Sequence, residues 1–113
     1  MHELSLSLSL VDLLADRCRQ EGLARITRVV LEVGALSGVE PESLRFCFDA
    51  ATQGTLAEGA SLDIRSQPGR GCCPVCGEEY DLAHLAAPCT HCGGYGARLV
   101  SGQALRVREF EGC

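Results

Sequence analysis

Apolar residues recur at helical spacing over residues 4–21, which predicts an amphipathic helix near the start of the chain. Charged side chains such as Asp12 and Asp16 fall largely between the apolar positions. Gly22 is the expected end of this helix, because glycine takes the left-handed conformation at a helix C-terminus without steric cost. The residues expected on its buried face are Leu4, Leu8, Val11, Leu14 (or Ala15) and Cys18.

A period of two then replaces the helical period and predicts a strand over residues 25–33, where β-branched residues dominate. Pro41 suits the first position of a second helix, where its missing N–H costs nothing, and Gly54 ends that helix. Further strands are predicted over residues 61–65 and 104–110. The expected buried face of the second helix consists of Leu44, Cys47 (or Phe48) and Ala51.

The composition shifts sharply over residues 68–98, which hold three of the four prolines, many glycines and little periodicity. We therefore predict an α+β fold, with a small three-stranded β-sheet packed with two helices and an inserted zinc-ribbon-like domain built on four cysteines. The expected division is residues 1–67 plus 99–113 for the α/β body and residues 68–98 for the inserted metal-binding domain.

Composition and charge exclude several classes of function. The chain has 113 residues and a formal net charge of −5, so it lacks the cationic surface that nucleic acids require, and we expect no nucleic-acid partner. No apolar run approaches the roughly 20 residues that span a bilayer, and the N-terminus lacks the basic start of a signal peptide, so we expect no membrane association. We expect a cytoplasmic protein, in which eight cysteines indicate metal binding before disulfides.

Two C-x-x-C pairs, Cys73–Cys76 and Cys89–Cys92, are separated by 12 residues. Each pair can direct two thiolates at one point, and zinc favours the resulting tetrahedral arrangement. Four thiolate ligands leave no open position, which favours a structural site over a catalytic one. The alternatives are disulfides, which the compartment disfavours, a redox dithiol, which needs only one pair, and iron, which the spacing does not exclude.

The remaining cysteines, and two of the histidines, are expected to lie outside the set of metal ligands. Cys72 would give a wider spacing to Cys76, so Cys73 is the better ligand and Cys72 a spare thiol. Cys18 and Cys47 are expected as small core residues on the helices, and Cys113 as an exposed thiol. His84 and His91 are expected to be exposed polar residues, although a supporting or accessory role beside the metal stays open.

The first three residues, Met1-His2-Glu3, offer an amine, backbone amides, one imidazole and one carboxylate. Such a segment can hold a divalent ion in a square plane, the geometry that nickel(II) and copper(II) favour. On composition alone, His2 is more often a solvated residue at a frayed chain end.

Three motifs in the chain favour a metal-binding His2 over a solvated one. In chain order they are Met1-His2-Glu3-Leu4-Ser5, then Leu31-Glu32-Val33-Gly34-Ala35-Leu36-Ser37, then the two C-x-x-C pairs. Together they closely resemble the HypA/HybF family of nickel-insertion accessory proteins for [NiFe]-hydrogenase, over essentially the whole chain. The extra Cys72 is the main departure from the family pattern.

The resemblance implies a nickel metallochaperone and no enzyme. It implies that the α/β body binds nickel through His2, with Glu3 and the amine and amides of Met1 to Glu3, and that zinc is held by Cys73, Cys76, Cys89 and Cys92. The implied partners are a HypB-type GTPase accessory protein and the [NiFe]-hydrogenase large subunit, with urease maturation factors in some members. Whether the chain is a monomer or a homodimer is left open.

Two other classes of protein are alternatives to a nickel metallochaperone. A zinc-ribbon adaptor would bind a protein partner and zinc alone, whereas a carrier binds zinc plus a second, exchangeable ion. A thiol oxidoreductase would need a reactive cysteine of low pKa in place of four metal-bound ones. The sequence holds no nucleophile elbow, phosphate-binding loop or paired-acid motif, which favours a non-catalytic role.

Overall fold

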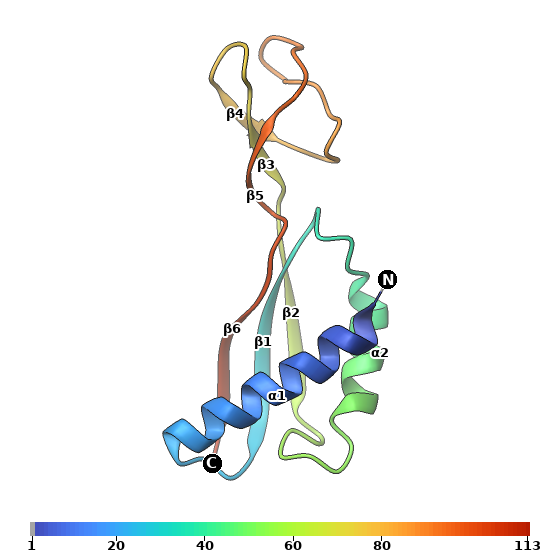
Figure 1. The fold of residues 1–113 in the computed structure, drawn as a ribbon, viewed down its shortest axis with the longest axis vertical. Coiled ribbons are helices and arrows are strands. Elements are labelled where there is room, and N and C mark those ends of the chain that lie inside the picture. Colours follow the sequence, from blue (N-terminus) through green and yellow to red (C-terminus); the bar gives the residue numbers. More distant parts are fainter. Residues whose placement is uncertain (1) are drawn as a thin grey trace.

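The computed structural model describes residues 2–113, so Met1 lies outside the described part. The molecule is elongated, with extents of 53 × 26 × 17 Å, and its long axis connects two unlike parts (Figure 1). A sheet covered by both helices forms one part, and a smaller sheet carrying long loops forms the other. No helix among residues 2–113 is long and apolar enough to cross a membrane.

The larger part holds five elements: α1 (Glu3–Glu21), β1 (Ile26–Gly34), α2 (Pro41–Ala51), β2 (Ser61–Gln67) and β6 (Leu105–Gly112). Its sheet has the order β2-β1-β6, in which β1 runs parallel to β2 and antiparallel to β6. The parallel pair is connected through α2, as parallel neighbours require a crossover. The predicted three-stranded sheet packed with two helices is thereby confirmed.

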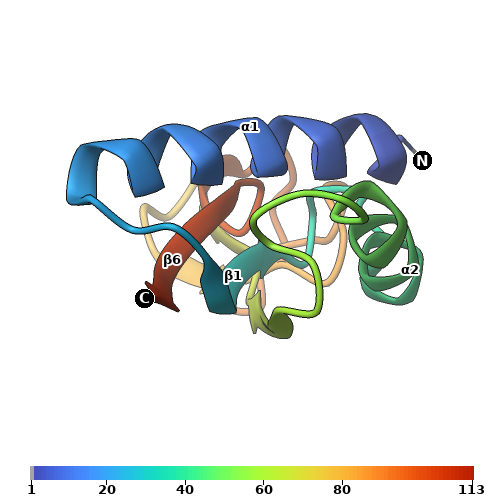
Figure 2. The same ribbon diagram turned by 90° about the horizontal axis from the view of Figure 1, so that it is seen from below.

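Both helices lie on the same face of this sheet (Figure 2), and the core forms between them and β1. Because β1 is the central strand, Val29 and Leu31 are fully buried beneath the helices. Phe48 of α2 and Cys18 of α1 fill the space from the other side, at 1% exposure each. The expectation of Cys18 as a core residue is therefore confirmed, and on α2 it is Phe48 that occupies the interior, while Cys47 is half-buried.

The N-terminal half of α1 corrects one expectation. Leu4 and Leu8 are 53% and 51% exposed, whereas Glu3 and Ser7 are buried at 6% and 0%. The buried stripe thus begins one position earlier than predicted and joins the expected positions only at Val11. At this end α1 packs on α2, where the Glu40 N–H donates to the Glu3 carboxylate. Hydrophobicity alone does not reveal which side of a helix meets a second helix.

The smaller part contains three short strands, β3 (Arg70–Cys72), β4 (Glu79–Asp81) and β5 (Arg98–Ser101), in the antiparallel order β4-β3-β5. We predicted no strands here, because segments of three or four residues are too short to display an alternating pattern. Its core is correspondingly small, with Tyr80 and Leu82 packed among the buried cysteines. The sequence boundaries proposed for the inserted domain stay a prediction.

Three glycines bring the two parts together where their connecting segments cross. A Cβ atom on Gly34 would lie 2.2 Å from the Gly102 carbonyl oxygen, and one on Gly102 would lie 2.5 Å from the Gly69 Cα. Gly102 also has a φ of +96°, which favours glycine. Beside this crossing, the Leu36 N–H donates to the Gly102 carbonyl at 2.8 Å, and its side chain packs against the core of the smaller part. The loop after β1 therefore contacts both parts.

Candidate metal centres

Two tight turns at the end of the smaller part position its four clustered cysteines. In the first turn the Gly77 N–H donates to the Cys73 carbonyl at 2.9 Å, and in the second the Gly93 N–H donates to the Cys89 carbonyl at the same distance. Gly77 and Gly93 have φ values of 79° and 78°, which explains why glycine follows each pair. The two turns are built alike.

Backbone amides also point at the sulfur atoms. The Val75 N–H donates to the Cys73 Sγ at 3.4 Å, and the His91 N–H donates to the Cys89 Sγ at 3.3 Å. The Gly94 N–H donates to the Cys92 Sγ at 3.4 Å. Hydrogen bonds of this kind stabilise negative charge on sulfur, so the loops are arranged to hold thiolates.

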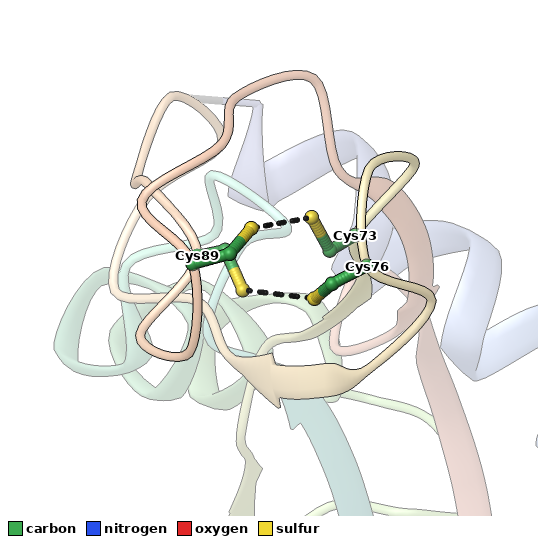
Figure 3. Close-up of side chains that lie close together, drawn as sticks. Cys73, Cys76 and Cys89 are labelled. Atoms are coloured by element: carbon green, nitrogen blue, oxygen red, sulfur yellow. Dashed lines mark hydrogen bonds between the residues drawn. The ribbon is translucent and has the colours of Figure 1, made fainter.

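The sulfur geometry fits a tetrahedral metal. The four Sγ atoms lie within 4.8 Å of one another. The Sγ atoms of Cys73 and Cys92 are 3.5 Å apart, and those of Cys76 and Cys89 are 3.7 Å apart. Figure 3 shows the labelled side chains of Cys73, Cys76 and Cys89 pointing toward one another. A tetrahedron with Zn–S distances of about 2.3 Å has sulfur separations of roughly 3.8 Å, so the cluster is compatible with a zinc site.

The neighbouring thiols oppose one another's ionisation when no cation lies between them. The amide N–H groups of Cys76 and Val75 lower the pKa of Cys73 to about 6. Although the Glu78 N–H favours the thiolate of Cys76, burial and the neighbouring cysteine sulfurs raise the pKa of Cys76 to about 12. The negative charge on one thiolate therefore disfavours ionisation of the next thiol, and a divalent cation at their centre would compensate that repulsion.

The other sulfur and imidazole groups lie outside this cluster. The Cys72 Sγ lies 3.6 Å from the Gly77 carbonyl oxygen, not among the four sulfurs. His84 and His91 are both exposed, and neither belongs to the cluster. Cys113 is exposed, but its backbone N–H donates to the Arg25 carbonyl at 3.0 Å, so the chain end is anchored.

The second candidate site is at the start of α1, away from the cysteine loops (Figure 1). His2 is the N-cap residue of α1, and its carbonyl accepts from the Leu6 N–H at 3.1 Å. Its side chain makes no capping hydrogen bond and is exposed. The imidazole is therefore available to a metal ion, while its backbone is fixed by the helix.

Glu3 is anchored differently from His2. Its Oε2 atom accepts from the Glu40 N–H at 3.1 Å, and Glu40 is itself the N-cap of α2. Hydrogen bonding to the chain's N-terminal ammonium, followed by that to the Glu40 N–H, lowers the pKa of the Glu3 carboxyl to about 2. Glu40 was not singled out in the sequence, because no local pattern indicates a contact between residues 37 positions apart. The predicted ligand Met1 lies outside the described residues.

Comparison with known proteins gives these two sites a context. Residues 1–112 match the family described as HypA, "Hydrogenase/urease nickel incorporation, metallochaperone, hypA". The chain belongs to the HypA family. It is 48% identical over 110 residues to the hydrogenase maturation factor HypA of Chlorobaculum tepidum, covering 97% of each chain. It is 49% identical over 111 residues to that of Geobacter sulfurreducens, covering 98% of each.

Two solved HypA structures share this fold. The chain is similar to the solution structure of the Ni metallochaperone HypA from Helicobacter pylori, with a TM-score of 0.73 and 23% identity over 99% of this chain and 97% of that one. A second HypA solution structure gives a TM-score of 0.74 at the same identity, covering 100% of this chain and 97% of that one. The predicted family and the predicted α+β fold with a zinc-binding domain are thus confirmed.

Proposed function

We propose that this chain is a nickel metallochaperone that takes up Ni(II) at its N-terminus and delivers it during [NiFe]-hydrogenase maturation. The observation that carries this proposal is the match to the HypA family from residue 1 to residue 112, which includes the Met1-His2-Glu3 segment. The exposed imidazole of His2, the N-cap residue of α1, supports the same proposal.

The ligand set follows from the contacts at the start of α1. The His2 imidazole is the side-chain ligand, and the amine and amide nitrogens of Met1 to Glu3 complete a square plane of the kind nickel(II) favours. The Glu3 carboxylate accepts from the Glu40 N–H, so we assign it the task of positioning the helix start against α2. Such a site is open on both faces, which suits release of the ion by ligand exchange.

At the other end of the molecule, we propose that Cys73, Cys76, Cys89 and Cys92 hold a resident zinc ion. The four sulfur atoms within 4.8 Å of one another and the N–H groups aimed at three of them support this role. Four thiolates exclude water and substrate from the metal, so the zinc would stabilise the loops and take no part in chemistry. No step of the proposed function requires catalysis.

The proposed recipients and helpers are the [NiFe]-hydrogenase large subunit and a HypB-type GTPase accessory protein, acting in the cytoplasm, with urease maturation as a second destination. The experiment that tests delivery is hydrogenase maturation in cells that lack their own HypA protein. The wild-type chain should restore nickel to the large subunit, and the His2→Ala variant should not, at equal protein level and zinc content. A zinc-only adaptor would restore maturation equally with either chain, and that result would contradict the carrier role.

A further inference from the structure

One face of the larger sheet carries a buried carboxylate that neither metal site uses. Side chains alternate along β1, so Val29 and Leu31 lie beneath the helices and Glu32 lies on the opposite face. Both helices cover the other face (Figure 2), and yet the Glu32 side chain is only 9% exposed. Carboxylates are rarely buried to this extent unless they are paired.

The pairing of this carboxylate is incomplete. Arg106 donates to the Glu32 Oε1 atom at 3.1 Å. Within residues 2–113, the second oxygen, Oε2, accepts no hydrogen bond, and it is not among the side-chain atoms sealed from solvent without a partner. The Oε2 atom is therefore open to a hydrogen-bond donor from outside the chain.

A pocket of about 460 Å³ lies against Glu32, and we call it the junction pocket. Its lining consists of Glu32, Gln67, residues 99–104 and Arg106. Residues 99–104 lead from β5 into β6, where the two parts of the molecule meet (Figure 1). The volume lies in the range of pockets that bind ligands.

The lining of the junction pocket favours a guanidinium group on an aliphatic stem. A carboxylate acceptor forms its strongest hydrogen bonds with charged donors. A guanidinium presents five N–H donors in a planar fork, so it can reach Glu32 and a second acceptor, such as the Gln67 carboxamide, at once. Leu99 is half-buried and Val100 is 47% exposed, so both offer apolar surface to the stem. These features match an arginine side chain.

Other classes of ligand fit this pocket less well. Among residues 2–113, the four clustered cysteines are the only group of three or more His, Cys, Asp or Glu side chains placed to hold a metal ion. An anion could approach Arg106, but the buried charge of Glu32 would repel it. The formal net charge of −5 likewise favours a cationic ligand over an anionic one.

We propose that the junction pocket binds an arginine side chain of a partner polypeptide, with the guanidinium donating to the Glu32 Oε2 atom. The partner is a polypeptide because Val100 adds exposed apolar surface, which residues flanking the arginine would cover and a free amino acid would not. The pocket shares no residue with the candidate nickel or zinc site, so this inference stands apart from the proposed nickel role.

Arg106 competes with the incoming arginine. Its guanidinium occupies the Glu32 Oε1 atom and adds positive charge, although its side chain is 69% exposed and therefore well screened by water. Removing the charge of Glu32 should weaken binding, whereas removing that of Arg106 should strengthen it. An ion pair with a purely structural role would not give effects of opposite sign on binding.

Calorimetric titration of the full, zinc-loaded chain with the blocked peptide acetyl-Thr-Val-Arg-Val-Thr-amide tests the proposal. Glu32→Gln should weaken binding by about tenfold or more, because a charge-assisted hydrogen bond is lost. Arg106→Gln should strengthen binding severalfold. A peptide with citrulline in place of arginine keeps the shape of the side chain and removes its charge, so it should bind the wild-type chain about tenfold more weakly or worse.

The matched control is Glu109→Gln, which removes one negative charge from an exposed position of β6 outside the junction pocket. It should bind the peptide like the wild type. Zinc content and melting temperature are recorded for each variant, and if Glu32→Gln does not fold, Arg106→Gln and the citrulline peptide decide the question.

Three results would overturn the proposal. They are no binding of the arginine peptide to the wild type at millimolar concentration, equal binding of the citrulline peptide, and weaker binding in Arg106→Gln. Free arginine that bound as tightly as the peptide would contradict a polypeptide partner.

Discussion

The cysteine loops and the start of α1 both point to metal, but they are built in different ways. At the cysteine loops, four side chains converge and their supporting N–H groups come from residues two positions along the chain. At the start of α1, one imidazole is exposed, and the neighbouring carboxylate is held by an amide 37 residues away. The first site is complete in its own loops, whereas the second depends on the packing of α1 against α2.

This difference suits two different tasks. A closed set of thiolates binds zinc tightly and gives a small core the stability that its few buried residues cannot supply. An open site with one imidazole binds more weakly and can pass its ion to a better ligand. The comparison predicts that disturbing the cysteines affects folding, whereas removing the His2 imidazole affects nickel binding alone.

The largest expected effect is the loss of zinc. In Cys89→Ser, one thiolate is removed and the zinc should be lost, because structural zinc sites contribute on the order of 10 kcal/mol to folding. Strands β3 to β5 should then exchange their amide protons rapidly, while β1 keeps its protection. Hydrogen exchange monitored by mass spectrometry, with zinc analysis, checks this.

Cys72→Ser is the matched control, because its sulfur lies outside the cluster. It should keep its zinc and its exchange pattern. If Cys72→Ser lost zinc and Cys73→Ser retained it, the ligand would be Cys72 and our assignment of the first pair would be wrong.

An intermediate effect is expected from the Glu3 carboxylate, whose hydrogen bonds include the one from the Glu40 N–H that connects α1 to α2. The pKa of the Glu3 carboxyl is lowered from 4.5 to about 2, so its contribution to stability is fully present above pH 4.5 and is lost as the pH falls toward 2. Glu3→Gln should therefore melt a few degrees below wild type at neutral pH, and the difference should shrink over that acidic range. Thermal melts at several pH values measure it.

Glu42→Gln serves as the control, since Glu42 is an exposed residue in the first turn of α2. Its melting difference from wild type should not follow pH in the same way. A Glu3→Gln protein that melted like wild type at every pH would remove the structural role assigned to this carboxylate.

The smallest expected effect concerns one hydrogen bond beneath the cysteine loops. The Tyr80 Oη donates to the Ala87 carbonyl at 2.9 Å, and Tyr80 is 2% exposed. Tyr80→Phe should lower the free energy of unfolding by about 1 kcal/mol. It should also release zinc to a chelator somewhat faster, because the loop that leads to Cys89 loses this hydrogen bond. Tyr95→Phe, at an exposed position, should release zinc at the wild-type rate.

How far the sequence predicts this molecule depends on how local each feature is. The helices, the strands of the larger sheet and the convergence of four cysteines follow from patterns within a few residues. Strands β3 to β5 are too short to show a pattern. The burial of Ser7 in place of Leu8, and the contact between Glu3 and Glu40, arise only when α1 packs against the rest of the chain, so no local signal indicates them.

The most direct test of the two-site account is a nickel titration of untagged, zinc-loaded protein beside its His2→Ala variant, with zinc content recorded throughout. The account predicts about one exchangeable nickel per wild-type chain, its loss in His2→Ala, and unchanged zinc in both proteins. Equal nickel binding by both proteins, or loss of zinc in the variant, would contradict the separation of an open nickel site from a closed zinc site.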